Sequence, residues 1–189
     1  MNTLTSVDWS TIPAPENHGA ADHLSGMTLP SVTLAATDGG RVDLSALAGT
    51  TVVFVYPRTG RPDQDLPDGW NMIPGARGCT PQACAFRDLH GELKDNGVEH
   101  LFGLSVQDTD YQREAGERLH LPFPLLSDQA FELTDALNLP TFEAAGMRLL
   151  KRLTLIIRDG RVVQAFYPVF PPDRSADDVV AWLQAERAA

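Results

Sequence analysis

The chain has 189 residues, with 15 basic and 25 acidic side chains and a formal net charge of −10. This length suits one domain that buries about 70% of the surface exposed by the unfolded chain. The acidic balance and the lack of a Lys/Arg cluster make nucleic acid and anionic membranes poor partners. The longest apolar stretches are strand-sized, far short of the roughly 20 residues of a membrane helix.

Residues 1–26 are polar and mixed in composition. They predict an irregular N-terminal extension, followed by a single domain over residues 27–189. The first residues lack the basic start and apolar core of a signal peptide. With only two cysteines in the chain, this indicates a reducing, cytoplasmic setting. A close cysteine pair is there more often catalytic than structural.

The first β-type segments follow this extension. Residues 31–37 and 40–44 flank Asp38-Gly39, a tight-turn dipeptide, and therefore predict a hairpin. Residues 51–56 form a continuous apolar, β-branched run. Such a run predicts a strand that is buried on both faces of a sheet.

Residues 58–74 predict a long loop, here named the insertion loop, because prolines and glycines recur through it. A loop of this length in a compact domain is usually functional. A harmless surface insertion is the alternative. The presence of Trp70 predicts that the insertion loop packs onto the rest of the domain.

The remaining elements alternate between helices and strands. A helical pattern over 81–96 leads into an apolar run over 98–106, and strand, helix, strand in this order predicts a parallel pair. The later elements are a helix over 108–120, an extended segment over 121–126, a helix over 129–138 capped by Ser127 or Asp128, a hairpin of 152–157 and 161–167 around Asp159-Gly160, and a helix over 175–188 opened by a capping-box pattern. The order predicts an α/β domain with a central mixed sheet flanked by helices.

The only two cysteines, Cys79 and Cys84, lie at the start of the predicted helix over 81–96, which follows the predicted strand over 51–56. A thiol there faces unpaired backbone N–H groups and the positive end of the helix dipole, which favour the thiolate. A second thiol a few residues on can trap an oxidised first one, so the pair suggests redox catalysis. Buried cysteines that act only as small apolar residues are the alternative. No metal site is expected, because the five histidines are scattered and a structural zinc site needs four ligands.

Residues 78–84 read Gly-Cys-Thr-Pro-Gln-Ala-Cys and are followed by Phe86-Arg87-Asp88. This motif resembles the peroxiredoxins, most closely the Q, or bacterioferritin-comigratory, subfamily. Supporting matches are Tyr56-Pro57, residues 122–128 and residues 152–157, and together the resemblance spans most of the chain from about residue 28. It implies a thioredoxin-like fold, in agreement with the predicted element order.

The resemblance also implies roles for single residues. Cys79 would be the peroxidatic cysteine and Cys84 the resolving one, and Arg152 would be the family's active-site arginine. The backbone N–H groups near Gly78 and Cys79, with a threonine hydroxyl, would hold the peroxide. Gln82 is a candidate hydrogen-bond partner.

One part of the family pattern is missing. The family places a proline seven residues before the peroxidatic cysteine and a Thr or Ser three before it, where this chain has Met72 and Ala76. Pro57 and Thr59 look like the displaced counterparts, separated from the cysteine by the insertion loop. Either Thr59 or Thr80 would then supply the active-site hydroxyl, and Thr59 is favoured.

The implied activity is reduction of hydrogen peroxide and organic hydroperoxides, with recycling by thioredoxin or a similar dithiol. The resemblance leans towards a monomer and implies no cofactor. It leaves open the preferred peroxide, the reductant and whether Cys84 resolves Cys79. Two other functions stay possible: a thiol–disulfide oxidoreductase of the same fold, which usually has a closer cysteine pair, and a redox-regulated binding module whose contact surface is the acidic insertion loop.

The cysteine spacing has a geometric consequence. Five residues along an ideal helix separate the Cα atoms of Cys79 and Cys84 by roughly 8.7 Å, beyond the ~7 Å limit for a disulfide. The start of the helix must therefore unwind before the two thiols can join. Pro81 makes this easier because it has no N–H group to lose.

Overall fold

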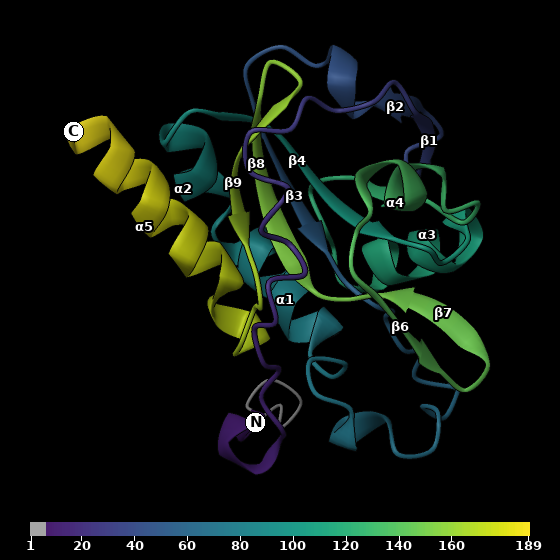
Figure 1. The fold of residues 1–189 in the computed structure, drawn as a ribbon. Coiled ribbons are helices and arrows are strands. Elements are labelled where there is room, and N and C mark those ends of the chain that lie inside the picture. Colours follow the sequence, from purple (N-terminus) through teal and green to yellow (C-terminus); the bar gives the residue numbers. More distant parts are fainter. Residues whose placement is uncertain (1–6) are drawn as a thin grey trace.

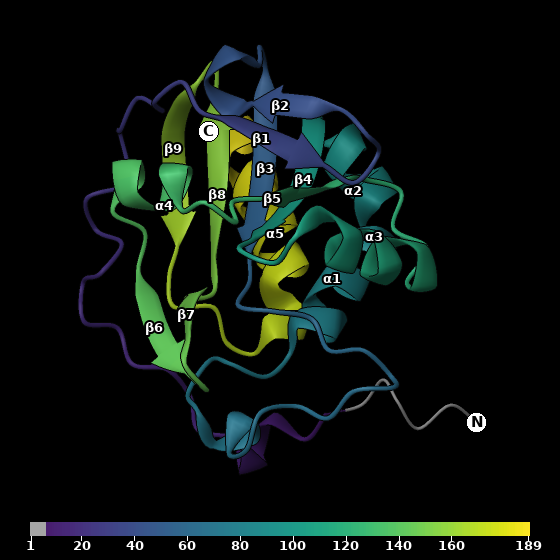
Figure 2. The ribbon, with the colours of Figure 1, turned by 90° about the vertical axis from the view of Figure 1, so that its right-hand side faces the viewer.

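A seven-stranded mixed sheet with the order β2-β1-β5-β4-β3-β8-β9 runs through the centre of the protein (Figures 1 and 2). The structure of the protein is a computed structural model that describes residues 7–189. The strands of this sheet are β1 (Thr33–Ala36), β2 (Arg41–Asp43), β3 (Thr50–Val55), β4 (Val98–Ser105), β5 (Leu125–Ser127), β8 (Leu153–Arg158) and β9 (Arg161–Phe166). A separate two-stranded sheet consists of β6 (Thr141–Ala144) and β7 (Met147–Leu150). The helices are α1 (Cys79–Asp88), α2 (His90–Asp95), α3 (Thr109–Arg118), α4 (Glu132–Leu137) and α5 (Ser175–Ala188).

The central strand β3 pairs in parallel with β4 and antiparallel with β8. Its side chains alternate between two apolar layers: Val52 and Phe54 belong to one buried cluster, Val53 and Val55 to the other. All four are fully buried. The predicted parallel crossover and the strand buried on both faces are therefore confirmed.

Helices cover both faces of the sheet (Figure 1). Phe86 of α1, Leu93 of α2 and Val179 of α5 pack in one apolar layer, whereas Leu133 and Leu137 of α4 pack in the other. This arrangement confirms the predicted α/β class with a central mixed sheet. Both predicted hairpins, β1–β2 and β8–β9, are present as well.

The helix expected over 81–96 is in fact two helices. The first, α1, begins at Cys79, earlier than expected, because Gly78 takes the N-cap position with a positive φ of 113°. Leu89 separates α1 from α2 with a ψ of 11°, outside the helical range. Both cysteines consequently lie inside α1.

Two expectations about helix starts also change. The helix α4 begins at Glu132 rather than residue 129, and Phe131 takes the N-cap position instead of Ser127 or Asp128. The Asp128 carboxylate nevertheless accepts from the amides of Leu133 and Thr134 in the first turn. The prediction of a capping box at the start of α5 is wrong. Ser175 is already the first helical residue, and its hydroxyl bonds to neighbouring side chains rather than to the helix amides.

The hairpin of β6 and β7 was not expected from the sequence. Its turn is Ala145-Gly146, with φ of 51° and 73°, and the alanine hides the usual turn signal. The insertion loop packs against this hairpin. Trp70 is 3% exposed and forms a buried cluster with Ala76 and Leu149, which confirms the prediction that the insertion loop is anchored.

The N-terminal extension lies partly outside the described residues, since the structure describes it only from residue 7. A short 3₁₀ turn covers Trp9–Thr11, and the rest of residues 7–26 has no regular helix or longer strand. Nevertheless, Ala21 and Leu24 are buried in the core, and Gly26 bonds to the backbone of Val162 in β9. Among residues 7–189 no helix is long and apolar enough to cross a membrane, and no three His, Cys, Asp or Glu side chains gather as a metal site would require.

Candidate active site

Cys79 is the first residue of α1 and is almost fully buried, with 5% of its surface exposed. The first amides of a helix have no partner within the helix, and they form the positive end of its dipole. The sulfur of Cys79 lies at this end, where a negative charge is favoured. It is also 3.8 Å from the carbonyl oxygen of Ala76.

Arg152 supplies a positive charge next to this sulfur. It stands directly before β8, whose Leu153 pairs with Val55 at the end of β3, so the sheet register brings the guanidinium to the start of α1. The Nη2 of Arg152 donates to the Sγ of Cys79 at 3.2 Å and to the carbonyl oxygen of Ala76 at 3.1 Å. Only 3% of Arg152 is exposed, so water screens the pair weakly.

A chain of buried polar side chains holds Arg152 in place. Its Nη1 donates to the Oε1 of Gln82, and the Nε2 of Gln82 donates to the Oγ of Ser175 at 3.3 Å. Ser175 in turn shares a 3.0 Å hydrogen bond with the hydroxyl of Thr154. Gln82 lies on α1, Thr154 on β8 and Ser175 on α5, so three elements fix the orientation of the guanidinium.

Sequence reasoning proposed Gln82 but missed Ser175 and Thr154. Thr154 carried a weak signal, as a polar residue within an apolar strand. The spacing of Ser175 to Asp178 fits a capping box and predicts a helix cap instead. Only the packing of α5 against α1 shows that this hydroxyl faces the protein interior.

The structure brings Arg152 to the start of α1, where Gly78 and Cys79 lie. It shows no hydrogen bond from Thr59 or Thr80 to Cys79 among residues 7–189. Thr59 is buried, and its N–H and hydroxyl both donate to the Oε1 of Gln107, at 2.9 and 3.3 Å. In the described part of the chain, no hydrogen bond joins Thr59 to Cys79. Its role as the active-site hydroxyl therefore stays a prediction.

The two remaining predicted residues lie in different surroundings. Pro57 is buried two residues after the end of β3. Thr80 lies beside Cys84 in a surface depression of about 330 Å³. Among residues 7–189, no side-chain hydrogen bond joins Thr80 to Arg152 or to Cys79, so its assignment to the peroxide site also stays a prediction.

Cys84 is a free thiol, as is Cys79, and α1 is intact between them. It is half-buried, and this burial raises the pKa of the Cys84 thiol above its ordinary value, while the nearby charge of Arg87 offsets part of the effect. Arg87 itself is occupied, because it donates to Asp88 and to the carbonyl oxygen of Leu119. The structure thus represents the reduced protein.

Trp9 is a further residue that the sequence did not assign to the site. Its ring and the ring of Pro172 lie against Gly78 so closely that a Cβ on that glycine would be 2.8 and 2.6 Å from them. The indole N–H of Trp9 donates to the carboxylate of Asp173 at 2.9 Å. The N-terminal extension therefore rests on the start of α1, although only a lone tryptophan in a polar stretch could have indicated it.

A mixed sheet flanked by helices, with a cysteine at a helix start beside a buried arginine, defines a thiol-dependent peroxidase of the thioredoxin-like class. The Redoxin family model matches residues 24–180. The chain belongs to the redoxin family and, within it, to the peroxiredoxin Q, or bacterioferritin-comigratory, subfamily. It is accordingly a peroxidase, an oxidoreductase.

Individual relatives agree with this placement. The chain is 32% identical over 162 residues to chloroplastic peroxiredoxin Q of Populus jackii, covering 85% of this chain and 68% of that one. It is 31% identical over 175 residues to the Sedum lineare protein of the same name, covering 92% and 84%. Among solved structures, the peroxidoxin BcpB of Mycobacterium tuberculosis superimposes with a TM-score of 0.68 at 27% identity, covering 85% of this chain and 96% of that one.

Proposed function

We propose that Cys79 reduces hydrogen peroxide and organic hydroperoxides and that Cys84 then resolves the oxidised product as an intramolecular disulfide. The Cys79 thiolate attacks one peroxide oxygen, a sulfur–oxygen bond forms and the oxygen–oxygen bond breaks. The departing oxygen takes a proton from solvent and leaves as water or an alcohol, and Cys79 becomes a sulfenic acid. The observation that carries the proposal is the 3.2 Å contact between the Nη2 of Arg152 and the Sγ of Cys79 at the start of α1.

The environment of this contact supports the first step. The helix dipole and the guanidinium both favour negative charge on the attacking sulfur. They also favour negative charge on the departing oxygen, provided that the peroxide lies between the sulfur and donors near Gly78. Because Gln82 fixes the other arm of Arg152, the charge does not have to reorganise during the reaction.

In the second step, the thiol of Cys84 condenses with the Cys79 sulfenic acid, and a disulfide and one water molecule form. Both cysteines lie on the intact helix α1, where helix geometry keeps their Cα atoms roughly 8.7 Å apart. Unwinding of the first turn is therefore part of the proposed cycle. Unwinding would also expose Cys84 to water and so remove the burial that raises its pKa.

The proposed cycle closes when an external dithiol reduces the disulfide by thiol–disulfide exchange. Thioredoxin or a protein of similar chemistry is the expected reductant. A cytoplasmic setting suits this cycle, because the reductant must be kept reduced. We further expect the protein to act as a monomer without nucleic acid, given its net charge of −10.

Intact mass spectrometry tests the proposal directly. One equivalent of hydrogen peroxide is added to the reduced wild-type protein and to the Cys84→Ser and Cys79→Ser variants. We expect a loss of about 2 Da in the wild type, a gain of about 16 Da in Cys84→Ser and no fast change in Cys79→Ser. A gain of about 16 Da in the wild type as well would mean that Cys79 works without Cys84.

A further inference from the structure

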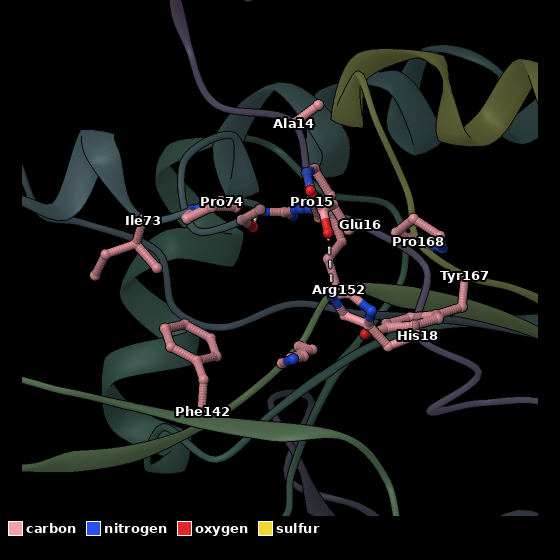
Figure 3. Close-up of a pocket in the computed structure, with 12 residues that line it drawn as sticks. Ala14, Pro15, Glu16, His18, Ile73, Pro74, Phe142, Arg152, Tyr167 and Pro168 are labelled. Carbon is pink, nitrogen blue, oxygen red and sulfur yellow. Dashed lines mark hydrogen bonds and ion pairs between the residues drawn. The ribbon is translucent and has the colours of Figure 1, made fainter.

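The N-terminal extension lies across the segment that leads into α1. Side chains from residues 14–18 face the end of the insertion loop around a cavity of about 390 Å³ beside the active site (Figure 3). A Cβ on Gly75 would meet the ring of Pro15 at 3.5 Å. Earlier in the chain, Trp9 lies against Gly78, the N-cap of α1. The extension thus touches the segment before α1 at two glycines.

Three contacts hold Trp9 in this position. Its ring would be 2.8 Å from a Cβ on Gly78, and the ring of Pro172 would be 2.6 Å from the same atom. Its indole N–H donates to the carboxylate of Asp173 at 2.9 Å, and its ring meets that of Phe170 edge-on, with centroids 6.0 Å apart. A hydrogen bond to a carboxylate and an edge-to-face aromatic pair are both favourable. Trp9 therefore fastens the N-terminal extension to residues 170–173 across Gly78.

These contacts oppose the movement that a disulfide requires. The Cα atoms of Cys79 and Cys84, roughly 8.7 Å apart along a helix, must come within about 7 Å of each other. Gly78 is bonded to Cys79, so a displacement of Cys79 out of the helix also displaces Gly78. The rings of Trp9 and Pro172 leave Gly78 no room on their side. The start of α1 can therefore unwind freely only after Trp9 has moved away.

We propose that Trp9 is a clamp on the start of α1 and sets the rate at which Cys84 resolves Cys79. This inference rests on the proposed function, in which the Cys79 sulfenic acid condenses with the Cys84 thiol and releases one water molecule. Trp9 stays on Gly78 while Cys79 reacts with peroxide, which keeps the helix start and its dipole intact. It detaches when α1 unwinds, so the beginning of the N-terminal extension is released in the oxidised protein.

The resolution step can be measured apart from the reaction with peroxide. The rate of Cys79 oxidation rises with the concentration of hydrogen peroxide, whereas resolution is intramolecular and does not depend on it. Mass spectrometry of acid-quenched samples follows the species heavier by about 16 Da as it becomes lighter than the reduced protein by about 2 Da. We expect Trp9→Ala to speed this conversion at least about tenfold. Trp9→Phe keeps a ring on Gly78 but loses the bond to Asp173, and should speed it about threefold.

Ser10→Ala is the matched control. Ser10 follows Trp9 in the same 3₁₀ turn, is exposed, and its hydroxyl donates to Asp8. This variant should resolve at the wild-type rate. A resolution rate in Trp9→Ala equal to or below that of the wild type would overturn the clamp, because loss of a residue that only supports the fold does not speed the step. A wild-type protein that does not react with peroxide would instead reject the proposed function, and this inference with it.

The release of Trp9 has a readout of its own. Chymotrypsin cleaves after an aromatic residue such as Trp9 only where the chain around it is accessible. We expect the product that begins at Ser10 to appear at least about tenfold faster from the oxidised wild type than from the reduced one. In Cys84→Ser, which forms no intramolecular disulfide, peroxide should leave the cleavage rate unchanged. Equal cleavage of the reduced and oxidised wild type, with the disulfide confirmed by mass, would show that Trp9 stays in place and would contradict the proposal.

Discussion

At the scale of the residue, the decisive feature is the burial of the pair formed by Arg152 and Cys79. Unit charges about 4 Å apart attract each other by about 1 kcal/mol in water, but by about 4 kcal/mol at the effective dielectric constant of about 20 found near protein groups. Arg152 is 3% exposed and Cys79 5%, so water screens the charge of Arg152 weakly at this sulfur. The neighbouring Arg77 carries the same charge, but its side chain forms no hydrogen bond among residues 7–189.

Replacing Arg152 by Met should therefore slow the reaction of Cys79 with hydrogen peroxide by about 10²–10³-fold, the usual effect of losing one donor to a developing oxyanion. Arg77→Met removes a charge of the same sign from the segment just before α1 and should change the rate by less than about threefold. Stopped-flow measurement of Cys79 oxidation gives both rates. Equal losses in the two variants would show that general positive charge, rather than the contact at the sulfur, drives the reaction.

At the scale of the element, the proposed cycle places two conflicting requirements on α1. The reaction with peroxide needs an intact helix start, because its dipole and the hydrogen bond that Arg152 donates to Gln82 act there. Disulfide formation needs the same turn to unwind, because Cys79 and Cys84 are too far apart along a helix. Trp9 and Pro172 lie on Gly78 and favour the folded state of this turn.

Hydrogen exchange can detect this unwinding. In the reduced protein the amide of Gln82 donates to the carbonyl oxygen of Gly78 at 3.0 Å, so it should be protected. After oxidation by peroxide, we expect the amides of residues 82–84 to exchange at least about tenfold faster, while those of α3 keep their rates. Mass spectrometry of peptides from both states measures the difference. Equal protection of residues 82–84 in the two states would rule out unwinding of α1.

At the scale of the whole molecule, the described surface shows few large apolar side chains. Over residues 7–189, the exposed ones are Leu66 and Met72, at 42% and 66%, and both belong to the insertion loop. A stable protein–protein interface buries about 1,200–2,000 Å² in total and usually centres on apolar anchors. Two side chains on one loop supply little of that area, and the net charge of −10 adds repulsion between copies.

We therefore predict that the reduced protein is a monomer of 20.6 kDa in solution. Sedimentation velocity over a range of protein concentrations, at low and at physiological salt, measures this. A mass that doubles with concentration would contradict the prediction. In that event, the same measurement on Met72→Asp would tell whether the insertion loop forms the contact, since the substitution places a charge on its most exposed apolar residue.

Much of the fold could be predicted because local pattern and tertiary structure agree in it. The apolar run at β3, the turn dipeptides at Asp38-Gly39 and Asp159-Gly160, and the strand–helix–strand order carry their own physical signals. The hairpin of β6 and β7 was missed, because its turn uses Ala145 where a stronger turn residue is usual.

The sequence by itself determined the family, the order of the central elements and the position of the two candidate thiols, because these depend on residue types at fixed spacing along the chain. Only the tertiary structure decided what surrounds the thiols. The contact of Arg152 with Cys79, the hydroxyl of Ser175 behind Gln82 and the cover of Trp9 over Gly78 join residues that are far apart in the chain. Such contacts depend on sheet register and helix packing, and a local pattern carries no information about either.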